Sequence, residues 1–197
     1  MGSTEADWIR QAAQGDDGAF TALVETYQRP VYNLCYRMLG DPQEAEDAAQ
    51  ESFWRAYQNL KRYDPQRSFL TWLLSIAAHY CIDQQRKRRL PLVPVEVLPE
   101  EAVPDHTPTP EKIVAMQLEN QALHQLLNQL PAPDRAAIVM RYWYDVSDEE
   151  IGQMLGMSVS AVKSRLFRAR KTLAKGWADS GQPLPFAEEE EHGTPAF

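Results

Sequence analysis

The sequence predicts an all-α protein with two small helical domains joined by a flexible linker. Apolar residues recur at helical spacing along most of the chain, and no useful length shows the alternation of a β-strand. Residues 91–111 hold six prolines and four acidic residues before Glu111, so this segment cannot bury a core. We therefore expect a first domain at 5–90, an acidic Pro-rich linker at 91–111, a second domain at 112–177, and an acidic disordered tail at 178–197.

The first domain begins with a predicted helix over 5–13, which stops at Gly15 and is followed by an Asp16-Asp17 cap. Apolar stripes from Phe20 to Tyr27 and from Val31 to Met38 then predict helix up to Gly40. Cys35 and Cys81 both lie on apolar stripes. They are predicted to be buried thiols in a reducing cytoplasm, with a regulatory disulfide as the less favoured alternative.

A helix over 42–60 is predicted to have two unlike faces. The buried face consists of Ala45, Ala49, Phe53, Ala56 and Leu60. The outward face carries Asp47, Gln50, Glu51, Trp54 and Gln58. A tryptophan among acids and amides indicates an anchor for a protein partner, and the acids favour a partner with a basic surface. The alternative is that Trp54 packs against a neighbouring loop.

Residues 61–68 are turn-like around Asp64-Pro65, and a helix follows from Phe69 into the cluster Arg86–Arg89. Its inward face is predicted to hold Leu73, Ile76, Ala77 and Tyr80, and its other face Thr71, Ser75, His79, Ile82 and Arg86. Aromatic rings at Tyr63, Phe69 and Trp72 beside cations are typical of a surface that binds single-stranded nucleic acid. Some of these rings are expected in the core instead, Trp72 first among them.

The second domain is predicted to hold a helix over 111–130, punctuated by Pro131 and Pro133, and then a three-helix unit from Asp134. Within that unit Ile151, Met154 and Leu155 form a short helix that Gly156 ends. Ser158 is placed as the N-cap of the next helix. Helix, short turn and helix is the helix-turn-helix pattern, whose second helix enters the major groove of DNA.

That second helix also has two faces. Val162, Leu166, Ala169 and Leu173 are predicted to close a small core. The outer side carries Ser160, Lys163, Ser164, Phe167, Arg168 and Lys171. Residues 163–175 include six basic residues and no acidic one. A solvated basic helix is the plain alternative, but the turn spacing together with the two-faced helix favours DNA binding.

Composition excludes several other classes. The net charge of −8 is unusual for a DNA-binding protein, but residues 91–120 and 178–197 together contribute −10, whereas 121–177 contribute +3. No phosphate-binding glycine loop, nucleophile motif or metal-ligand cluster is present, and a lone His79 is no metal site. We therefore expect no enzyme activity, no cofactor and no metal. No run approaches the ~20 apolar residues of a membrane span, so we expect a cytoplasmic protein without direct membrane insertion.

Three segments together resemble a known family. They are DAAQESFWRAYQNL, SFLTWLLSIAAHYCIDQQRKRR, and LNQLPAPDRAAIVMRYWYDVSDEEIGQMLGMSVSAVKSRLFRARKTL. In this order and spacing, over roughly residues 15–175, the chain is similar to the extracytoplasmic-function (ECF) sigma factors of bacteria. These have only sigma domains two and four, joined by a linker.

The resemblance implies a factor that binds core RNA polymerase and directs transcription initiation from promoter DNA. Its polymerase-binding residues, which would dock on the β′ clamp, are Asp47, Gln50, Glu51 and Trp54. The residues implied for opening and binding the −10 element are Tyr63, Ser68, Phe69, Thr71, His79, Arg86, Lys87 and Arg88. The −35 reading positions implied by the family are Lys163, Ser164, Phe167 and Arg168, to which the outer face adds Ser160 and Lys171. The β flap is a second polymerase contact, the linker would run toward the RNA exit channel, and an anti-sigma factor is an implied partner that could hold the protein at the membrane.

Two positions depart from the family's pattern. The family usually has Asn where His79 stands, which affects the expected −10 base preference. Its helix-turn-helix usually opens with EGLSYEEIA, where this chain reads YDVSDEEIG. A rival interpretation is a dimeric helix-turn-helix repressor with an N-terminal ligand-binding or dimerisation domain. Such a protein would bind palindromes without polymerase.

Overall fold

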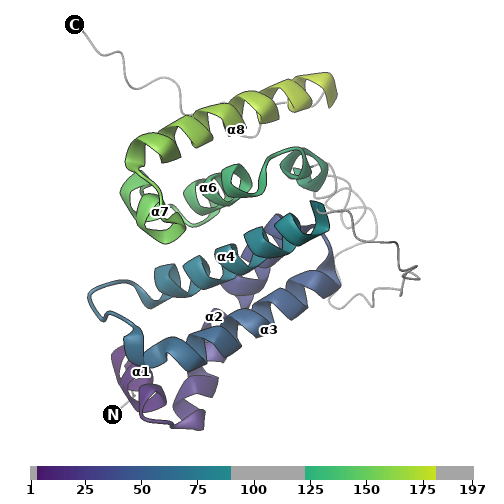
Figure 1. Ribbon diagram of the computed structural model, residues 1–197. Helices are drawn as coiled ribbons and strands as arrows, with labels where there is room; N and C mark the ends of the chain where they lie inside the picture. Colours follow the sequence, from purple (N-terminus) through teal and green to yellow (C-terminus); the bar gives the residue numbers. More distant parts are fainter. Residues whose placement is uncertain (1–3, 90–122, 181–197) are drawn as a thin grey trace, which may run out of the picture.

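The computed structural model describes residues 4–89 and 123–180, in which every regular element is a helix. This confirms the all-α class. Figure 1 shows two groups of helices stacked on each other, the N-terminal group (α1–α4) below and the C-terminal group (residues 123–128 and α6–α8) above. The predicted linker at 91–111 lies outside the described residues.

The N-terminal group consists of α1 (Glu5–Ala13), α2 (Asp17–Leu39), α3 (Pro42–Asn59), the 3-10 turn η1 (Leu60–Arg62) and α4 (Phe69–Arg89). Side-chain oxygens of Thr4, Asp16 and Asp41 accept hydrogen bonds from the first-turn amides of α1, α2 and α3. Helix α2 continues through Pro30 and ends at Gly40, whose φ of 81° is the left-handed conformation that glycine tolerates.

The core of this group lies between α2, α3 and α4. All five residues predicted for the inner face of α3 are buried, and so are the thiols of Cys35 and Cys81, which are free. The prediction for α4 was partly wrong. Leu73 and Ala77 are buried as expected, but Ile76 and Tyr80 are only half-buried. The buried side of α4 also includes Leu74, Ala78, Cys81 and Gln85.

The cause of this error is that α4 is covered from two sides. It contacts α2 and α3 below and the helices α6 and α7 above, as Figure 1 shows. Sequence periodicity locates a single apolar stripe, whereas a helix between two layers buries a wider arc.

The C-terminal group contains the helical residues 123–128, then α6 (Ala132–Trp143), α7 (Asp148–Leu155) and α8 (Val159–Ser180). The predicted helix-turn-helix is confirmed in detail. Gly156 ends α7 with φ 65°, and the Ser158 hydroxyl accepts a hydrogen bond from the Ala161 amide at 3.3 Å. Of the helix predicted at 111–130, only the part from 123 lies in the described residues, with Leu126 and Leu130 buried as expected. Helix α8 ends three residues beyond the predicted limit of 177.

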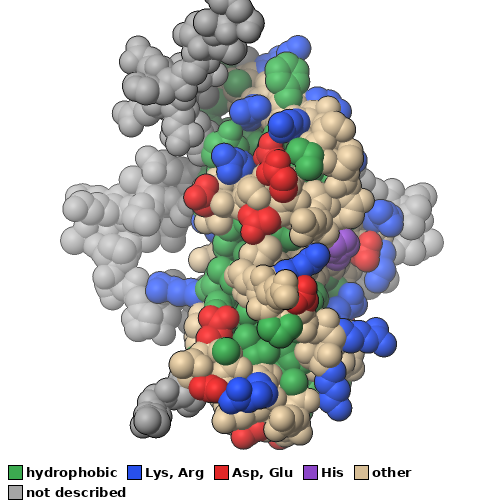
Figure 2. All heavy atoms as spheres, turned by 90° about the vertical axis from the view of Figure 1, so that its left-hand side faces the viewer, with side chains coloured by type: hydrophobic (Ala, Val, Ile, Leu, Met, Phe, Trp, Pro, Cys, Tyr) green, Lys and Arg blue, Asp and Glu red, His purple; other side chains and the backbone are tan. Residues whose placement is uncertain are grey.

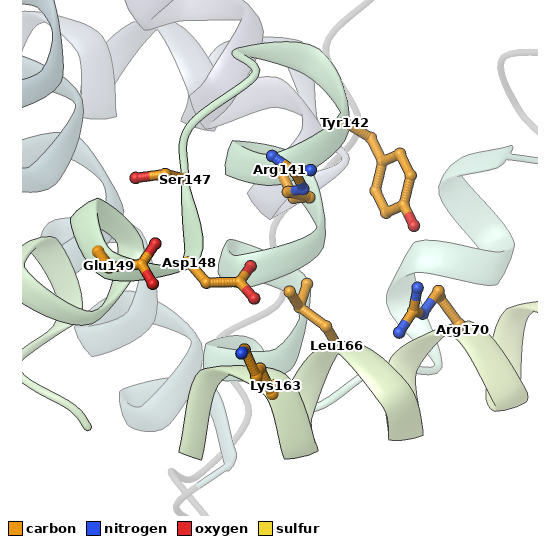
Figure 3. Close-up of a pocket in the computed structure, with 8 residues that line it drawn as sticks. All are labelled: Arg141, Tyr142, Ser147, Asp148, Glu149, Lys163, Leu166 and Arg170. Atoms are coloured by element: carbon orange, nitrogen blue, oxygen red, sulfur yellow. The ribbon is translucent and has the colours of Figure 1, made fainter. Parts of the chain in front are cut away.

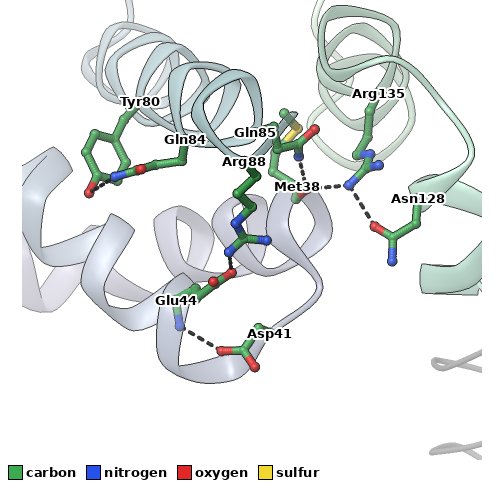
Figure 4. A network of polar contacts seen from close by, with 9 residues as sticks. All are labelled: Met38, Asp41, Glu44, Tyr80, Gln84, Gln85, Arg88, Asn128 and Arg135. Atoms are coloured by element: carbon green, nitrogen blue, oxygen red, sulfur yellow. Dashed lines mark hydrogen bonds and ion pairs between the residues drawn. The ribbon is translucent and has the colours of Figure 1, made fainter. Parts of the chain in front are cut away.

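Hydrogen bonds to α2 join the two groups. The Met38 carbonyl lies in the last turn of α2, where a helix has no partners of its own for its carbonyls, and Pro42 has no N–H to offer. Arg135 Nη1 on α6 donates to this oxygen at 2.5 Å, and Gln85 on α4 also donates to it (Figure 4). One carbonyl thus links three helices.

Aromatic contacts complete the junction. The Tyr144 hydroxyl donates to the Pro30 carbonyl at 2.6 Å, and burial raises the pKa of this phenol, which keeps it a neutral donor. The ring of His124 meets Tyr36 edge-on with centroids 4.2 Å apart. Burial, and then the nearby guanidinium groups of Arg37 and Arg135, lower the pKa of His124. This imidazole is therefore neutral at pH 7.

Candidate nucleic-acid and polymerase interfaces

Helix α8 presents the two faces that the sequence predicts. Val162, Leu166 and Ala169 are buried and Leu173 is half-buried. The six residues predicted for the outer face are all exposed, and Phe167 keeps 64% of its surface accessible. Figure 2 shows Lys and Arg side chains gathered at the end of the molecule that α8 forms. An exposed ring among hydroxyls and cations can contact bases and phosphates of a duplex.

A groove of about 360 Å³ lies beside this face, between α6, the start of α7 and α8 (Figure 3). Its lining residues are Arg141, Tyr142, Ser147, Asp148, Glu149, Lys163, Leu166 and Arg170. Both acidic and basic side chains line the groove. Among these lining residues, Lys163 is the one that the sequence predicts to read DNA. The six residues of the outer face of α8, by contrast, include three cations and no acidic residue.

The turn before α7 explains how the chain accommodates its departure from the family pattern. Asp145 has φ 49°, and within the described residues it is the one non-glycine with positive φ. It stands at the Gly position of the family's EGL. Aspartate tolerates the left-handed conformation better than most residues, and its carboxylate lies 3.7 Å from Arg141.

Helix α3 presents Trp54 to solvent. This ring is 56% exposed and stacks on Tyr57, with centroids 6.2 Å apart. The alternative that Trp54 packs against a loop is therefore wrong. Asp47 and Gln50 are exposed, whereas Glu51 is half-buried and accepts a hydrogen bond from Arg55 Nε at 2.7 Å. The predicted polymerase-binding residues thus share one face, with a large aromatic ring among acids and amides.

The aromatic residues between η1 and α4 need a correction. Phe69 is 1% exposed, so it does not offer its ring to a base. It packs in the core against Tyr63 and Tyr27, with ring centroids 5.4 Å away in each case. Trp72, expected to be the buried ring, is half-buried, 5.2 Å from Tyr63. Phe69 precedes the buried Leu73 and Ala77 by four and eight positions, so all three lie on the same inward-facing side of α4.

The remaining residues predicted for −10 binding differ in their surroundings. Tyr63 is half-buried and donates to the Arg67 carbonyl, while Ser68 is exposed and its hydroxyl accepts from the Thr71 amide at 3.4 Å. Thr71 is itself half-buried. Arg86, Lys87 and Arg88 are exposed at the end of α4. Arg86 lies 3.7 Å from Asp83, and Arg88 forms an ion pair with Glu44 (Figure 4).

A groove of about 450 Å³ runs between the end of α3 and α4. It is lined by Arg55, Asn59, Arg62, Trp72, Ser75, Ile76 and His79. His79 is exposed, and its Nδ1 lies 2.8 Å from the Ser75 carbonyl, which can only accept, so Nδ1 donates this hydrogen bond. The −10 residues predicted from the sequence do not include Arg55 and Asn59 of α3 or Arg62 of η1. Their i, i+4, i+7 spacing places them on one helix face and was available as a signal.

The described residues contain neither a metal cluster nor a membrane-spanning helix. They contain no group of three or more His, Cys, Asp or Glu side chains placed to hold a metal ion. None of their helices combines the length and apolar character needed to cross a membrane.

Comparison with known proteins places these surfaces in a family. Residues 23–90 match Sigma-70 region 2, and residues 120–173 match Sigma-70, region 4. The chain is 38% identical over 179 residues to the ECF RNA polymerase sigma factor SigW of Bacillus subtilis, covering 87% of this chain and 95% of that protein. It is 34% identical to the RNA polymerase sigma-H factor of Pseudomonas aeruginosa, covering 85% and 90% of the two chains.

Solved structures agree with this result. CnrH, determined in complex with the cytosolic domain of CnrY, has a TM-score of 0.66 and 26% identity, with 89% of this chain and 97% of that chain covered. The sigma factor RpoE of Bartonella quintana, determined with the anti-sigma factor NepR, shares the fold, with a TM-score of 0.61, 20% identity and coverage of 81% and 96%. The matches to regions 2 and 4 fall on the two helical groups, one with the exposed Trp54 and one with the helix-turn-helix. This chain therefore belongs to the ECF family of RNA polymerase sigma factors and acts in promoter-specific transcription initiation.

Proposed function

We propose that the two exposed aromatic rings mark the two main partner surfaces, Trp54 for core RNA polymerase and Phe167 for the −35 element. In the described part of the chain these are the large hydrophobic residues left exposed. Each lies on the face that the sequence assigns to a partner, and large apolar side chains on such faces are the usual anchors of an interface. This coincidence is the observation that carries the proposal.

The polymerase surface comprises Asp47, Gln50, Glu51 and Trp54, and its partner is the β′ clamp. The acids make this face attractive to a basic surface, and the ring supplies the apolar centre that polar rims surround. The pair Glu51–Arg55 fixes one edge of the face. The C-terminal group would contact the β flap as the second polymerase contact.

The −35 element would lie against Ser160, Lys163, Ser164, Phe167, Arg168 and Lys171. The buried inner residues hold α8 against α6 and α7, so the outer side chains project together from one rigid helix. Cations among them suit guanine edges or phosphates, and the Phe167 ring suits a thymine methyl group. A buried apolar side and an exposed side with polar and cationic residues are what a recognition helix requires.

The −10 element would lie in and beside the groove between α3 and α4. Trp72 and His79 supply rings in the groove, and Arg55 and Arg62 supply cations for the nucleic-acid backbone. The ring of Tyr63 lies beside the groove, with its centroid 5.2 Å from that of Trp72. Stacking on rings beside cations favours an opened strand over a duplex. The surface continues through Ser68 and Thr71 to Arg86, Lys87 and Arg88, without Phe69, and would assist strand opening.

Domain limits, location and regulation complete the proposal. We place sigma domain two at 5–90 and sigma domain four at 112–177, with the intervening linker near the RNA exit channel. The chain would act in the cytoplasm, because polymerase and promoter DNA are there. An anti-sigma factor is a further partner, which would mask both domains and could hold the protein at the membrane. CnrH, determined together with the cytosolic domain of CnrY, supports this part.

The test is selection of promoters by the full chain with and without bacterial core RNA polymerase. Core plus this chain should enrich, from a promoter library randomised at −35 and −10, sequences from which it starts transcription. The chain alone should not select palindromic sites, as a repressor would. Enrichment of palindromes without core, or no enrichment with core, would contradict the proposed function.

A further inference from the structure

Asp134 is a nearly fully buried carboxylate beside the recognition helix. It lies in the first turn of α6 and is 3% exposed. A buried carboxylate is costly unless cations or donors compensate it, although the amino end of a helix favours negative charge. The residue therefore needs partners, and α8 provides them.

The partners are two arginines one turn apart on α8. Arg165 Nη1 donates to Asp134 Oδ1 at 2.5 Å, and Arg168 Nε lies 3.6 Å from Oδ2. The Arg165 side chain is 30% exposed and that of Arg168 is 58% exposed. One carboxylate thus faces two guanidinium groups, with Arg165 the closer and Arg168 extending outward.

This geometry leaves the outer end of Arg168 available. Within the described residues neither Nη atom of Arg168 has a hydrogen-bonding partner, because the carboxylate faces Nε. Two parallel N–H groups are what the O6 and N7 acceptors of guanine require in the major groove. A guanidinium that forms an ion pair on its Nε side has fewer orientations to lose when it binds than one on a free side chain.

We infer that Asp134 is a positioning residue for base reading: it orients the Arg168 guanidinium toward the −35 element without touching DNA. The inference rests on the proposed −35 role of α8. It adds a specificity-determining residue from a different helix, one that spacing on α8 does not reveal. The competing role is purely structural, in which Asp134 joins α6 to α8 through Arg165 and does not influence which base is read.

The experiment uses holoenzyme assembled from the full chain and bacterial core RNA polymerase. The probe is the promoter duplex that wild-type holoenzyme enriches from a library randomised at −35, compared with the same duplex carrying a scrambled −35 segment. The measured quantity is the ratio of the two dissociation constants. Asp134→Asn keeps the size of the side chain and removes its charge. It should reduce this discrimination about tenfold, and Arg168→Ala should do so at least as strongly.

The double variant separates positioning from stability. If Asp134 acts through Arg168, adding Asp134→Asn to Arg168→Ala should reduce the discrimination no further. If its role is purely structural, Asp134→Asn leaves the discrimination unchanged, whether or not it weakens binding to both duplexes. If Asp134 affects discrimination independently of Arg168, the two losses multiply. Either result overturns the inference. Asp134→Glu serves if the Asn variant unfolds at the assay temperature. A displaced carboxylate should still lower discrimination, and unchanged discrimination would overturn the inference. A wild-type holoenzyme that enriches no −35 sequence would instead contradict the proposed function.

Discussion

Replacement of Trp54 by alanine tests the polymerase surface most directly. The indole contributes little to the free protein, since its described ring contact is the stack on Tyr57 at 6.2 Å and over half of it is exposed. Trp54→Ala should therefore leave the N-terminal group folded. In the complex, however, the exposed part of the ring would be removed from water.

The expected loss follows from that area. An exposed fraction of 56% corresponds to roughly 140 Å² for a large aromatic side chain. At ~25 cal/mol per Å² this burial contributes up to roughly 3.5 kcal/mol, and truncation of an interface anchor costs at least about 2 kcal/mol. We expect the Kd for core RNA polymerase to rise roughly 30- to 300-fold. The assay is a fluorescence titration of labelled chain with core.

Two matched variants control this measurement. Gln58→Ala changes another exposed residue of α3 and should leave the affinity for core nearly unchanged. Phe167→Ala removes the other exposed ring, and it should weaken −35 binding while core binding stays largely intact. Wild-type affinity for core in a folded Trp54→Ala variant would refute the assignment of this face.

Four further outcomes are expected. Lys171→Ala should weaken all promoters about equally and lower the salt slope by about one unit, whereas Arg168→Ala should cost roughly 1–3 kcal/mol on the cognate −35 sequence and less on others, both measured as Kd across a salt series. His79→Asn should change the −10 base preference in a randomised library without abolishing initiation, because the amide offers a donor and an acceptor together. Asp145→Val should lower the free energy of unfolding by roughly 1–2 kcal/mol, since φ 49° penalises a β-branched residue, and Asp145→Gly should not lower it in the same urea titration. The pKa of His124 is lower in the folded protein than in the unfolded chain. As the pH falls, the unfolded chain therefore binds this proton before the folded protein does. The contribution of neutral His124 to the free energy of unfolding is thus complete above pH ~6.5 and declines as the pH falls below that value. His124→Gln should remove this part of the loss in urea midpoints measured between pH 7.5 and 5.5.

Local chemistry made the helix-turn-helix predictable. Gly156 and Ser158 fix the turn through backbone conformation and capping, which depend on neighbouring residues alone. The stripe from Val162 to Ala169 is buried because α8 packs on one side only. Under these conditions a period of 3.6 residues identifies both the core face and the binding face.

Contacts between distant segments could not be predicted in this way. Arg135 and the Met38 carbonyl are 97 positions apart, and nothing local indicates that they meet. The same limit explains why the inner arc of α4 was misplaced and why Phe69 was assigned to DNA. It also explains why Asp134 went unnoticed, because its role depends on the packing of α6 against α8.

Charge shows how an acidic chain can present a basic face. Several carboxylates of the C-terminal group are engaged within the fold: Asp134 faces two arginines of α8, and Asp145 lies beside Arg141. Glu150 accepts hydrogen bonds from the hydroxyl and then the backbone N–H of Ser147, which lower the pKa of its carboxyl. In the described residues, by contrast, Lys163, Arg170, Lys171 and Lys175 have no ion pair.

The consequence is that the field around α8 is set by cations that are free to meet phosphates, while many nearby anions are held at caps and turns. Phosphate affinity depends on the local number of such cations, because each contact releases counterions. The net charge of −8 arises mainly from residues 91–120 and 178–197, which lie outside the stretch 160–171 that carries the DNA-facing side chains of α8. Local charge on one helix face, rather than the sum over the chain, therefore determines DNA binding.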